Sequence, residues 1–394
     1  MYNKTRFVLY GCMAFLIFTS AATAPGQGVV VSVLEPGYTT GTIVLPENVA
    51  GALAPHPANP DLLFVSAGAF GAHHIYKVNV SDLNSPVVTP VVTRDIDSIG
   101  GLAVIDDTHL IVTNNTDRTV FPFYSGNPTG LPVETTLLCQ DLNTDGDFDD
   151  TGEIVELIAP IKISNPDPVF GLFTGSQVRV VPTGGPGALP AGAAVVQTAD
   201  GATSSELLVI VNPTNQATAA YHPAGDSWFE GFGYNGGLDF YAAVTVAAGA
   251  YDGVFALSDA DMSGRIDAAG ESNLLVGPGD LGFYSLYDLV IDAEGDLFAT
   301  ANDFSAGQIQ TLPIPSSPLT APSTPMTPFA QTNSPFVTAM AISSKARSFD
   351  PPATGNDAVL FFEANGPGFS NNPIVFWIAP GPQPPSAVDD WAAY

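Results

Sequence analysis

Apolar residues along this chain occur in short runs rich in valine, threonine and phenylalanine, and the runs are separated by Gly, Pro, Asn and Asp. No long stretch places an apolar residue every three or four positions, the spacing that favours an amphipathic helix. Short apolar runs bounded by turn-forming residues are typical of β-strands. The pattern therefore predicts an all-β fold.

One of these runs recurs as a strand that begins with leucine and ends five residues later with asparagine. Its four copies are Leu110–Asn115, Leu207–Asn212, Leu297–Asn302 and Leu360–Asn365. A fifth candidate, Leu63–Gly68, has glycine in place of the asparagine. The recurrence predicts a repeat protein whose units share one kind of strand.

Two of the copies follow a matching apolar strand and an acidic turn, which predicts β-hairpins with turns at Asp106–Asp107 and Ala293–Gly295. The second hairpin, from Asp288 to Asn302, has the sequence DLVIDAEGDLFATAN. It resembles the repeat of β-propellers in the NHL and gluconolactonase-like group, in which an apolar strand, an acidic turn ending in glycine and a second apolar strand recur once per blade. Propellers of this group serve as binding platforms and as enzymes, so the resemblance implies a fold without deciding the chemistry.

Two stretches of thirteen residues, 141–153 and 259–271, are copies of one loop, since five of their thirteen positions are identical. Oxygen-bearing side chains occupy loop positions 1, 3, 5 and 9 around a glycine at position 6, which is how a chain surrounds a calcium ion with oxygen ligands. The loop resembles an EF-hand loop over its first nine positions. It departs at position 12, where both copies have glycine and the glutamate comes one residue later.

Short apolar runs flank both copies in place of helical patterns, so a strand, loop, strand unit is expected. We predict calcium sites in both loops, and an acidic turn that binds no metal is the alternative. That alternative has more weight in the second loop, where Ser263 and Arg265 dilute the negative charge. The residues assigned to the two metal sites are Asp141, Asn143, Asp145, Asp147, Asp149 and Glu153 in the first loop and Asp259, Asp261, Ser263, Arg265, Asp267 and Glu271 in the second.

The spacing of the repeats predicts the number of blades. The loops lie 118 residues apart and the two hairpins 187, which fits two and three units of about 60 residues. We therefore predict a six-bladed β-propeller over residues 25–380, with a seven-bladed ring or β-sandwich domains as alternatives. Either 29–34 or 42–45 is expected to pair into the last blade and close the ring, which leaves no long exposed sheet edge. The expected blades are residues 50–96, 97–170, 171–230, 231–281, 282–330 and 331–380.

Residues 1–24 have the pattern of a secretory signal peptide, with Lys4 and Arg6 before an apolar run at 7–18 and small residues after it. The run is too short for a permanent membrane span, so no integral membrane segment is expected. At the other end, residues 381–394 form a proline-rich linker followed by SAVDDW. This ending resembles the start of the cadherin-like or immunoglobulin-like domains of bacterial surface proteins. A secreted protein, extracellular or at the cell surface, is predicted.

Composition excludes some partners. The signal contains two of the ten Lys and Arg residues, so the rest of the chain has 39 acidic and 8 basic side chains and a formal charge of −31. Nucleic acid and anionic membrane surfaces are excluded as partners by this charge. Cys139 is the single cysteine outside the signal, so an internal disulfide is excluded as well. Bound calcium is expected to supply part of the stability that disulfides would give.

A catalytic constellation is not apparent in the sequence. The five histidines lack metal-ligand spacing, and G-x-S-x-G, phosphate-loop and H-E-x-x-H motifs are missing. His74 is the best single candidate for chemistry, with a plain loop histidine as the alternative. The aromatic stretch 228–241, too irregular for a strand, is a candidate surface for sugar or protein recognition, or else an anchor for a long loop.

Gluconolactonase-like enzymes hold a catalytic metal at the centre of the ring, and the resemblance implies a set of strand-ending side chains that could converge there. Asparagine also caps strand ends without any ligand, which is the alternative. The members of this set are Asn115, Asn212, Asn302, Asp303, Glu363 and Asn365.

We therefore expect a secreted, calcium-binding β-propeller that serves as a binding or structural module at the cell surface, with a protein or glycan ligand. The missing catalytic motifs favour a protein without enzymatic activity. The alternative is a metal-dependent hydrolase or lactonase with a metal in the central channel.

Overall fold

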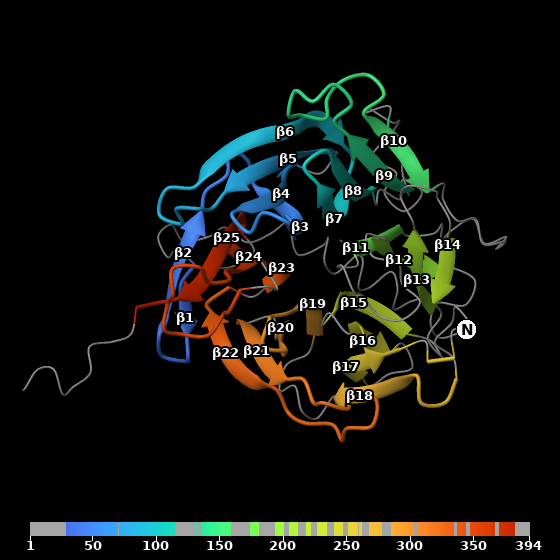
Figure 1. The fold of residues 1–394 in the computed structure, drawn as a ribbon, viewed down its shortest axis with the longest axis vertical. Helices are drawn as coiled ribbons and strands as arrows, with labels where there is room; N and C mark the ends of the chain where they lie inside the picture. The colour runs from blue at the N-terminus through green and yellow to red at the C-terminus, as the bar shows by residue number, and fades with distance from the viewer. Residues whose placement is uncertain are drawn as a thin grey trace, which may run out of the picture.

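The computed structural model describes the chain between residues 29 and 382, with gaps. The described residues are 29–69, 71–114, 131, 135–158, 174–180, 194–200, 205–211, 218–221, 227–234, 240–246, 251–258, 260–261, 268–277, 285–302, 306–334, 337–343, 347–366 and 370–382. These residues form strands and no helix, and the strands pair antiparallel into six sheets that stand around a ring (Figure 1). The predicted all-β propeller is therefore confirmed. In the described part of the chain, no helix has the length and apolar character needed to cross a membrane.

The sheets are numbered here in chain order, and their strands are given from the innermost outward. Sheets 1 to 3 consist of β3 (Val49–Pro55), β4 (Leu62–Ala69), β5 (Ala72–Asn79) and β6 (Val87–Ile96); β7 (Ile99–Asp106), β8 (His109–Asn114), β9 (Thr135–Gln140) and β10 (Ile154–Ile158); and β11 (Thr174–Val180), β12 (Ala194–Asp200), β13 (Ser205–Val211) and β14 (Thr218–Tyr221). Sheets 4 to 6 consist of β15 (Ser227–Tyr234), β16 (Phe240–Val246), β17 (Tyr251–Leu257) and β18 (Ser272–Val276); β19 (Ser285–Ile291), β20 (Asp296–Asn302), β21 (Gly307–Pro313), β22 (Thr327–Thr332) and β1 (Val31–Val33); and β23 (Val337–Ile342), β24 (Leu360–Gly366), β25 (Ser370–Pro380) and β2 (Tyr38–Ile43).

The innermost strands stand around the centre of the ring, and this central region is called the central channel below. In the order β3, β7, β11, β15, β19 and β23 each contacts the next, and β23 contacts β3, so the ring of sheets is closed (Figure 1). The innermost strands of a propeller all begin on one face of the ring and end on the other. We call these the upper face and the lower face. Because the sheets are antiparallel, the second strands run back and end at the upper face.

Two N-terminal strands join sheets formed by the C-terminal part of the chain, and β2 closes the ring. β2 pairs with β25 over its whole length, from Tyr38 opposite Pro380 to Ile43 opposite Val375, and so forms the outer edge of sheet 6. β1 pairs with β22 one sheet earlier. Segment 29–34 therefore joins sheet 5, while the strand that closes the last sheet begins slightly before the expected segment 42–45.

Apolar side chains fill the spaces between neighbouring sheets. Between sheets 5 and 6, Phe298, Phe329 and Phe349 are buried, and the Phe298 ring meets the other two edge to face, with centroids 5.1 Å from Phe329 and 5.4 Å from Phe349. Such aromatic contacts add to the stabilisation that burial of the rings already gives. Between sheets 6 and 1, Ile43 of the closing strand packs with Trp377 and Leu63. The closing strand is therefore part of the core.

The leucine-to-asparagine repeat marks the second strand of four sheets, namely β4, β8, β20 and β24. The copy at 207–212 is different, because residues 207–211 lie in β13, the third strand of sheet 3. The expectation that 228–241 is too irregular for a strand is wrong. Residues 227–234 and 240–246 pair as β15 and β16, and a register shift between Phe229 and Gly231 absorbs the irregular spacing.

Candidate functional site

The two thirteen-residue loops occupy equivalent positions in the ring. Loop 141–153 joins β9 to β10 in sheet 2, and loop 259–271 joins β17 to β18 in sheet 4. Both therefore connect the third and fourth strands, on the lower face, and their offset of 118 residues corresponds to two sheets. In the second loop Asp261 and Glu271 are described, whereas Asp259, Ser263, Arg265 and Asp267 lie outside the described residues.

In the first loop, polar side chains turn inward around Gly146, whose φ of 97° favours glycine. The Asp141 carboxylate accepts hydrogen bonds from the backbone amides of Asp145, at 3.2 Å, and Gly146, at 3.0 Å. The Asn143 side-chain amide donates to the carboxylates of Asp145 and Asp150. Desolvation and the neighbouring acids, Glu153 first among them, raise the pKa of Asp150. Negative oxygens are therefore gathered here in the way a hard cation needs.

Asp147 and Asp149 have different contacts. The Asp147 carboxylate accepts the Asp149 amide, at 3.0 Å. The Asp149 carboxylate reaches sheet 1, where it accepts the amides of Thr93, at 2.9 Å, and Arg94, at 3.0 Å. Phe148 is buried and donates its amide to the Val91 carbonyl at 2.9 Å. Positions 8 and 9 of the loop thus fasten sheet 2 to β6 of sheet 1.

The glutamate that comes one position late has the same task in both loops. Glu153 accepts the amides of Leu142, at 2.9 Å, and Asp150, at 3.0 Å, and its side chain is buried. Glu271 is equally buried and accepts the amides of Asp261, at 3.2 Å, and Ala268, at 2.8 Å. Each glutamate therefore ties the start of its loop to the end, which explains why the pattern departs from an EF-hand loop at this point.

No group of three or more His, Cys, Asp or Glu side chains is placed to hold a metal ion within the described ranges. In the first loop several carboxylates are bonded to backbone amides instead. The oxygen donors of Asp141, Asn143 and Asp145 nevertheless fit calcium by their chemistry. Calcium in the loops stays a prediction.

His74, the candidate from the sequence, lies on β5 near the upper face. Its Nδ1 is 2.8 Å from Glu47 and its Nε2 is 3.0 Å from Asp95. Burial lowers the pKa of His74, but the two carboxylates outweigh burial and raise it above the usual value. The His74 ring lies between these two carboxylates and so ties the segment that follows β2 to sheet 1. Both ring nitrogens are engaged, so this arrangement favours a structural role.

The neighbouring His73 explains the glycine in the fifth copy of the repeat. In sheet 5, Asn302 bonds both backbone groups of Val337, the first residue of the next innermost strand, at 2.8 Å each. In sheet 1, Gly68 stands in place of the asparagine, and His73 lies directly opposite it. The His73 Nδ1 accepts the amide of Ile99, the first residue of β7, at 2.8 Å. Burial lowers the pKa of His73 to about 4, so the ring is neutral and can accept.

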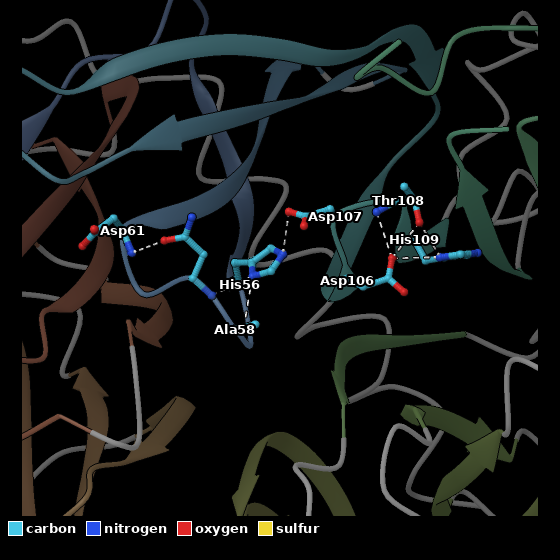
Figure 2. A network of polar contacts seen from close by, with 8 residues as sticks. His56, Ala58, Asp61, Asp106, Asp107, Thr108 and His109 are labelled. Carbon is cyan, nitrogen blue, oxygen red and sulfur yellow. Dashed lines mark hydrogen bonds and ion pairs between the residues drawn. The ribbon is translucent and has the colours of Figure 1, made fainter. Parts of the chain in front are cut away.

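Figure 2 shows a further polar network on the hairpins at the lower end of β3 and β7. His56 is buried, and its Nδ1 accepts the amides of Ala58 and Asn59 at 3.1 and 2.9 Å. Its Nε2 lies 3.2 Å from Asp107 without the geometry of a hydrogen bond. Asp106 accepts from His109 at 2.8 Å. The histidines of this network order two turns.

An ion pair that the sequence did not indicate joins two innermost strands across the channel. Arg179 lies on β11 of sheet 3 and Asp288 on β19 of sheet 5. The Arg179 Nη2 is 2.8 and 2.9 Å from the two oxygens of Asp288. Asp288 also accepts the amides of Leu289 and of Met340 on β23, each at 2.8 Å. Burial raises the pKa of Asp288, and Arg179 with the two amides opposes that rise.

Glu363 lies on β24 beside the innermost strand β23. It is 4% exposed, and it accepts a hydrogen bond from the Thr338 hydroxyl at 2.9 Å. Burial raises its pKa to about 7 against the opposing effect of that hydrogen bond. The carboxyl therefore takes up and releases a proton near neutral pH, which is a property expected of a general acid or base.

The repeat shows that Glu363 is an exception. At the same position of the leucine strand, sheets 1, 2 and 5 have Ser66, Thr113 and Thr300. Each of these hydroxyls bonds the backbone of its innermost strand where the register shifts, as Ser66 does with the Ala52 amide at 3.0 Å. Sheet 6 has the same register shift, between Val337 and Met340, with a carboxyl in place of the hydroxyl.

The channel residues implied by the gluconolactonase resemblance do not form a metal site in the described part of the chain. Of this set, Asn302 uses its side-chain amide on Val337. Asp288, which the resemblance did not imply, accepts four hydrogen bonds from three nitrogen atoms. Asn115, Asn212 and Asp303 lie outside the described residues, as does the side chain of Asn365. The described residues therefore do not fit a metal in the channel.

Cys139 is buried in β9. Burial raises the pKa of its thiol to about 12, so at neutral pH it carries no thiolate. It fills space in the core between sheets 1 and 2.

Solved structures of the same fold are known, although no protein-family model and no curated protein matches this chain. A luciferin-regenerating enzyme is 12% identical, with 87% of this chain and 95% of that chain covered and a TM-score of 0.52. An aldose sugar dehydrogenase from Streptomyces coelicolor is 12% identical, with 90% and 99% covered and a TM-score of 0.52. A gluconolactonase from Xanthomonas campestris is 10% identical, with 91% and 99% covered and a TM-score of 0.53.

All three are enzymes. At these identities the likeness shows the fold, a β-propeller. Because the neighbours are enzymes, the comparison contradicts the prediction of a binding or structural module. It agrees better with the alternative that the sequence also offered, a metal-dependent hydrolase or lactonase with a metal in the central channel, whose metal the described residues do not fit.

Proposed function

We propose that this chain is a hydrolase of the lactonase type and that its reaction takes place beside the upper part of the central channel. The observation that carries the proposal is Glu363, a buried carboxyl with a pKa of about 7 at a position where other sheets have a hydroxyl. A solved gluconolactonase of the same fold supports the reaction class. A metal in the channel is no part of the proposal, because the described residues do not fit one.

Glu363 would act as a general base. The ionised carboxylate takes a proton from a water molecule as the water oxygen attacks the carbonyl carbon of a lactone. The ring C–O bond then breaks, the ring oxygen takes up a proton, and the product is a hydroxycarboxylate. The Thr338 hydroxyl holds one carboxyl oxygen at 2.9 Å, which leaves the other oxygen to face the water.

The position of Glu363 supports a chemical role over a structural one. A serine or threonine there satisfies the backbone of the register shift at little cost, as Ser66 does. A buried carboxyl costs stability, since its charged form is poorly solvated. Groups that cost stability and have a shifted pKa are typical of active sites.

The calcium loops belong to the proposal as stabilising elements. We propose that the six sheets are the complete set of blades and that calcium in loops 141–153 and 259–271 stabilises sheets 2 and 4. Export by residues 1–24, a further domain after 381–394, and a protein or glycan partner at the cell surface stay predictions of the sequence.

The proposal is tested by steady-state hydrolysis of five- and six-membered sugar and aliphatic lactones, followed by acid release. Glu363→Gln keeps the volume and the bond from Thr338 but removes the base, so kcat should fall about 100- to 10,000-fold with KM little changed. Ser66→Ala is the matched control and should retain kcat. A wild-type protein inactive on every lactone, or a Glu363→Gln variant with full kcat, would overturn the proposal.

A further inference from the structure

The Arg179–Asp288 pair places a positive charge in the centre of a strongly acidic protein. The chain has 39 acidic and 10 basic residues and a formal charge of −29, so a lysine or arginine in the channel is unusual for it. Asp288 is 1% exposed and Arg179 19% exposed. The pair links sheets 3 and 5, which are not neighbours in the ring.

The hydrogen bonds show how fully Asp288 is occupied. Each carboxylate oxygen accepts one N–H from a backbone amide and lies within 2.9 Å of the Arg179 Nη2. All of these partners are donors, which fits the ionised carboxylate and leaves no oxygen open toward the channel. A metal ion at Asp288 would therefore have to displace the guanidinium.

Arg179 has donors to spare. Its Nη2 serves Asp288, and its Nη1 makes one long contact of 3.3 Å with the Val178 carbonyl. A guanidinium has five N–H donors in a rigid plane, so a second edge remains for an anion while Asp288 fixes the orientation of the plane.

The anchor of this guanidinium lies close to Glu363. Asp288 accepts the amide of Met340, and Glu363 accepts the hydroxyl of Thr338, two residues earlier on β23. The cation and the proposed base are therefore positioned by the same short segment of one innermost strand.

We propose that the Arg179 guanidinium is the resident cation of the channel, in the position a metal ion would otherwise take beside Asp288, and that its free edge binds the carboxylate of a hydroxy acid. The second half rests on the proposed function, because a hydroxy acid is what lactone opening yields. The first half is independent of it.

Binding of Mn²⁺ tests the first half without any activity. Arg179→Met removes the charge at similar volume and leaves Asp288 facing the channel, so this variant should bind one more Mn²⁺ per chain than wild type by titration followed with electron paramagnetic resonance. Arg179→Lys and the double variant Arg179→Met with Asp288→Asn should gain none. Ions bound by the loops cancel in the comparison.

Two results would overturn this half. One is a folded Arg179→Met variant with no additional Mn²⁺. The other is a loss of one Mn²⁺ in Asp288→Asn alone, which would mean that the wild-type channel already holds a metal. This second measurement decides the matter even where Arg179→Met fails to fold.

Calorimetric binding of a six-carbon aldonate tests the second half. The affinity for the aldonate should be at least tenfold lower in the double variant Arg179→Met with Asp288→Asn than in wild type. The affinity for a neutral six-carbon polyol should be nearly the same in the two proteins. Unchanged aldonate affinity would overturn the assignment. The binding measurement needs no turnover. Absence of lactone hydrolysis would therefore count against the proposed function but would not change the measured affinity for the aldonate.

Discussion

Replacing Glu363 by glutamine should stabilise the protein, and the gain should depend on pH. In the folded protein the pKa of Glu363 is about 7, whereas in the unfolded chain the carboxyl releases its proton at the ordinary pKa of 4.5. Between these values the folded state binds more protons than the unfolded state, so stability falls as pH rises. The full loss of stability is reached above pH 7, and well below pH 4.5 there is no loss.

The magnitude follows from the width of that window. A difference of roughly 2.5 pKa units corresponds to about 3 kcal/mol at 1.36 kcal/mol per unit. Because Glu363 is 4% exposed, solvent screening reduces this free-energy difference little. Glutamine keeps the hydrogen bond from Thr338 and does not titrate. The free energy of unfolding of Glu363→Gln should therefore exceed that of wild type by about 3 kcal/mol at pH 8 and by less than about 1 kcal/mol at pH 5.

Urea denaturation of both proteins at pH 5 and pH 8 measures this difference. Other titrating groups, the loop carboxylates included, contribute equally to the two proteins and cancel. Ser66→Ala serves as a control and should lose stability at both pH values, because the Ala52 amide loses its partner. Equal effects of Glu363→Gln at the two pH values would refute a buried, proton-binding Glu363.

Three further predictions concern the fold. Gly41→Ala should destabilise the ring closure by about 1–3 kcal/mol in thermal denaturation, because a Cβ there would lie 2.4 Å from the Trp377 ring, whereas the exposed Thr40→Ala should have little effect. Asn302→Ala should cost about 2–4 kcal/mol in urea denaturation, since both backbone groups of Val337 lose their partner; a loss under 0.5 kcal/mol would mean that water replaces it. Chelation should lower the melting temperature, and calcium at about 100 times its Kd should restore about 2.7 kcal/mol; indifference to chelator would exclude calcium in the loops.

Local patterns in the sequence predicted the strands and the repeat. The leucine strand marks the same place in four sheets because a buried strand followed by a capped end must satisfy the same packing in each unit. The same pattern did not identify a second strand at 207–212, because residues 207–211 form a third strand. A short apolar run matches the pattern in any strand of a sheet, and the pattern does not say which strands lie beside it. The stretch 228–241 was not predicted as a strand, because Gly231 and Gly233 interrupt its apolar pattern. The strand forms nevertheless, because its pairing with β16 tolerates a register shift.

The candidate site was less accessible from the sequence. Glu363 was found as a strand-ending residue, but its significance comes from the hydroxyls at the equivalent positions, which only the register of the sheets aligns. Arg179 and Asp288 are 109 residues apart, and no local pattern connects them. His73 replaces an asparagine of the repeat from a different strand, so its role could not be seen from spacing either.

The pH dependence of kcat is the direct test of Glu363 as the general base. If Glu363 is the base, kcat of the wild-type protein on its best lactone should rise between pH 5 and 9 with an inflection near pH 7, and the residual rate of Glu363→Gln should lack that inflection. An inflection near pH 7 that persists in Glu363→Gln would rule out Glu363 as the base, because another group would then supply the proton transfer.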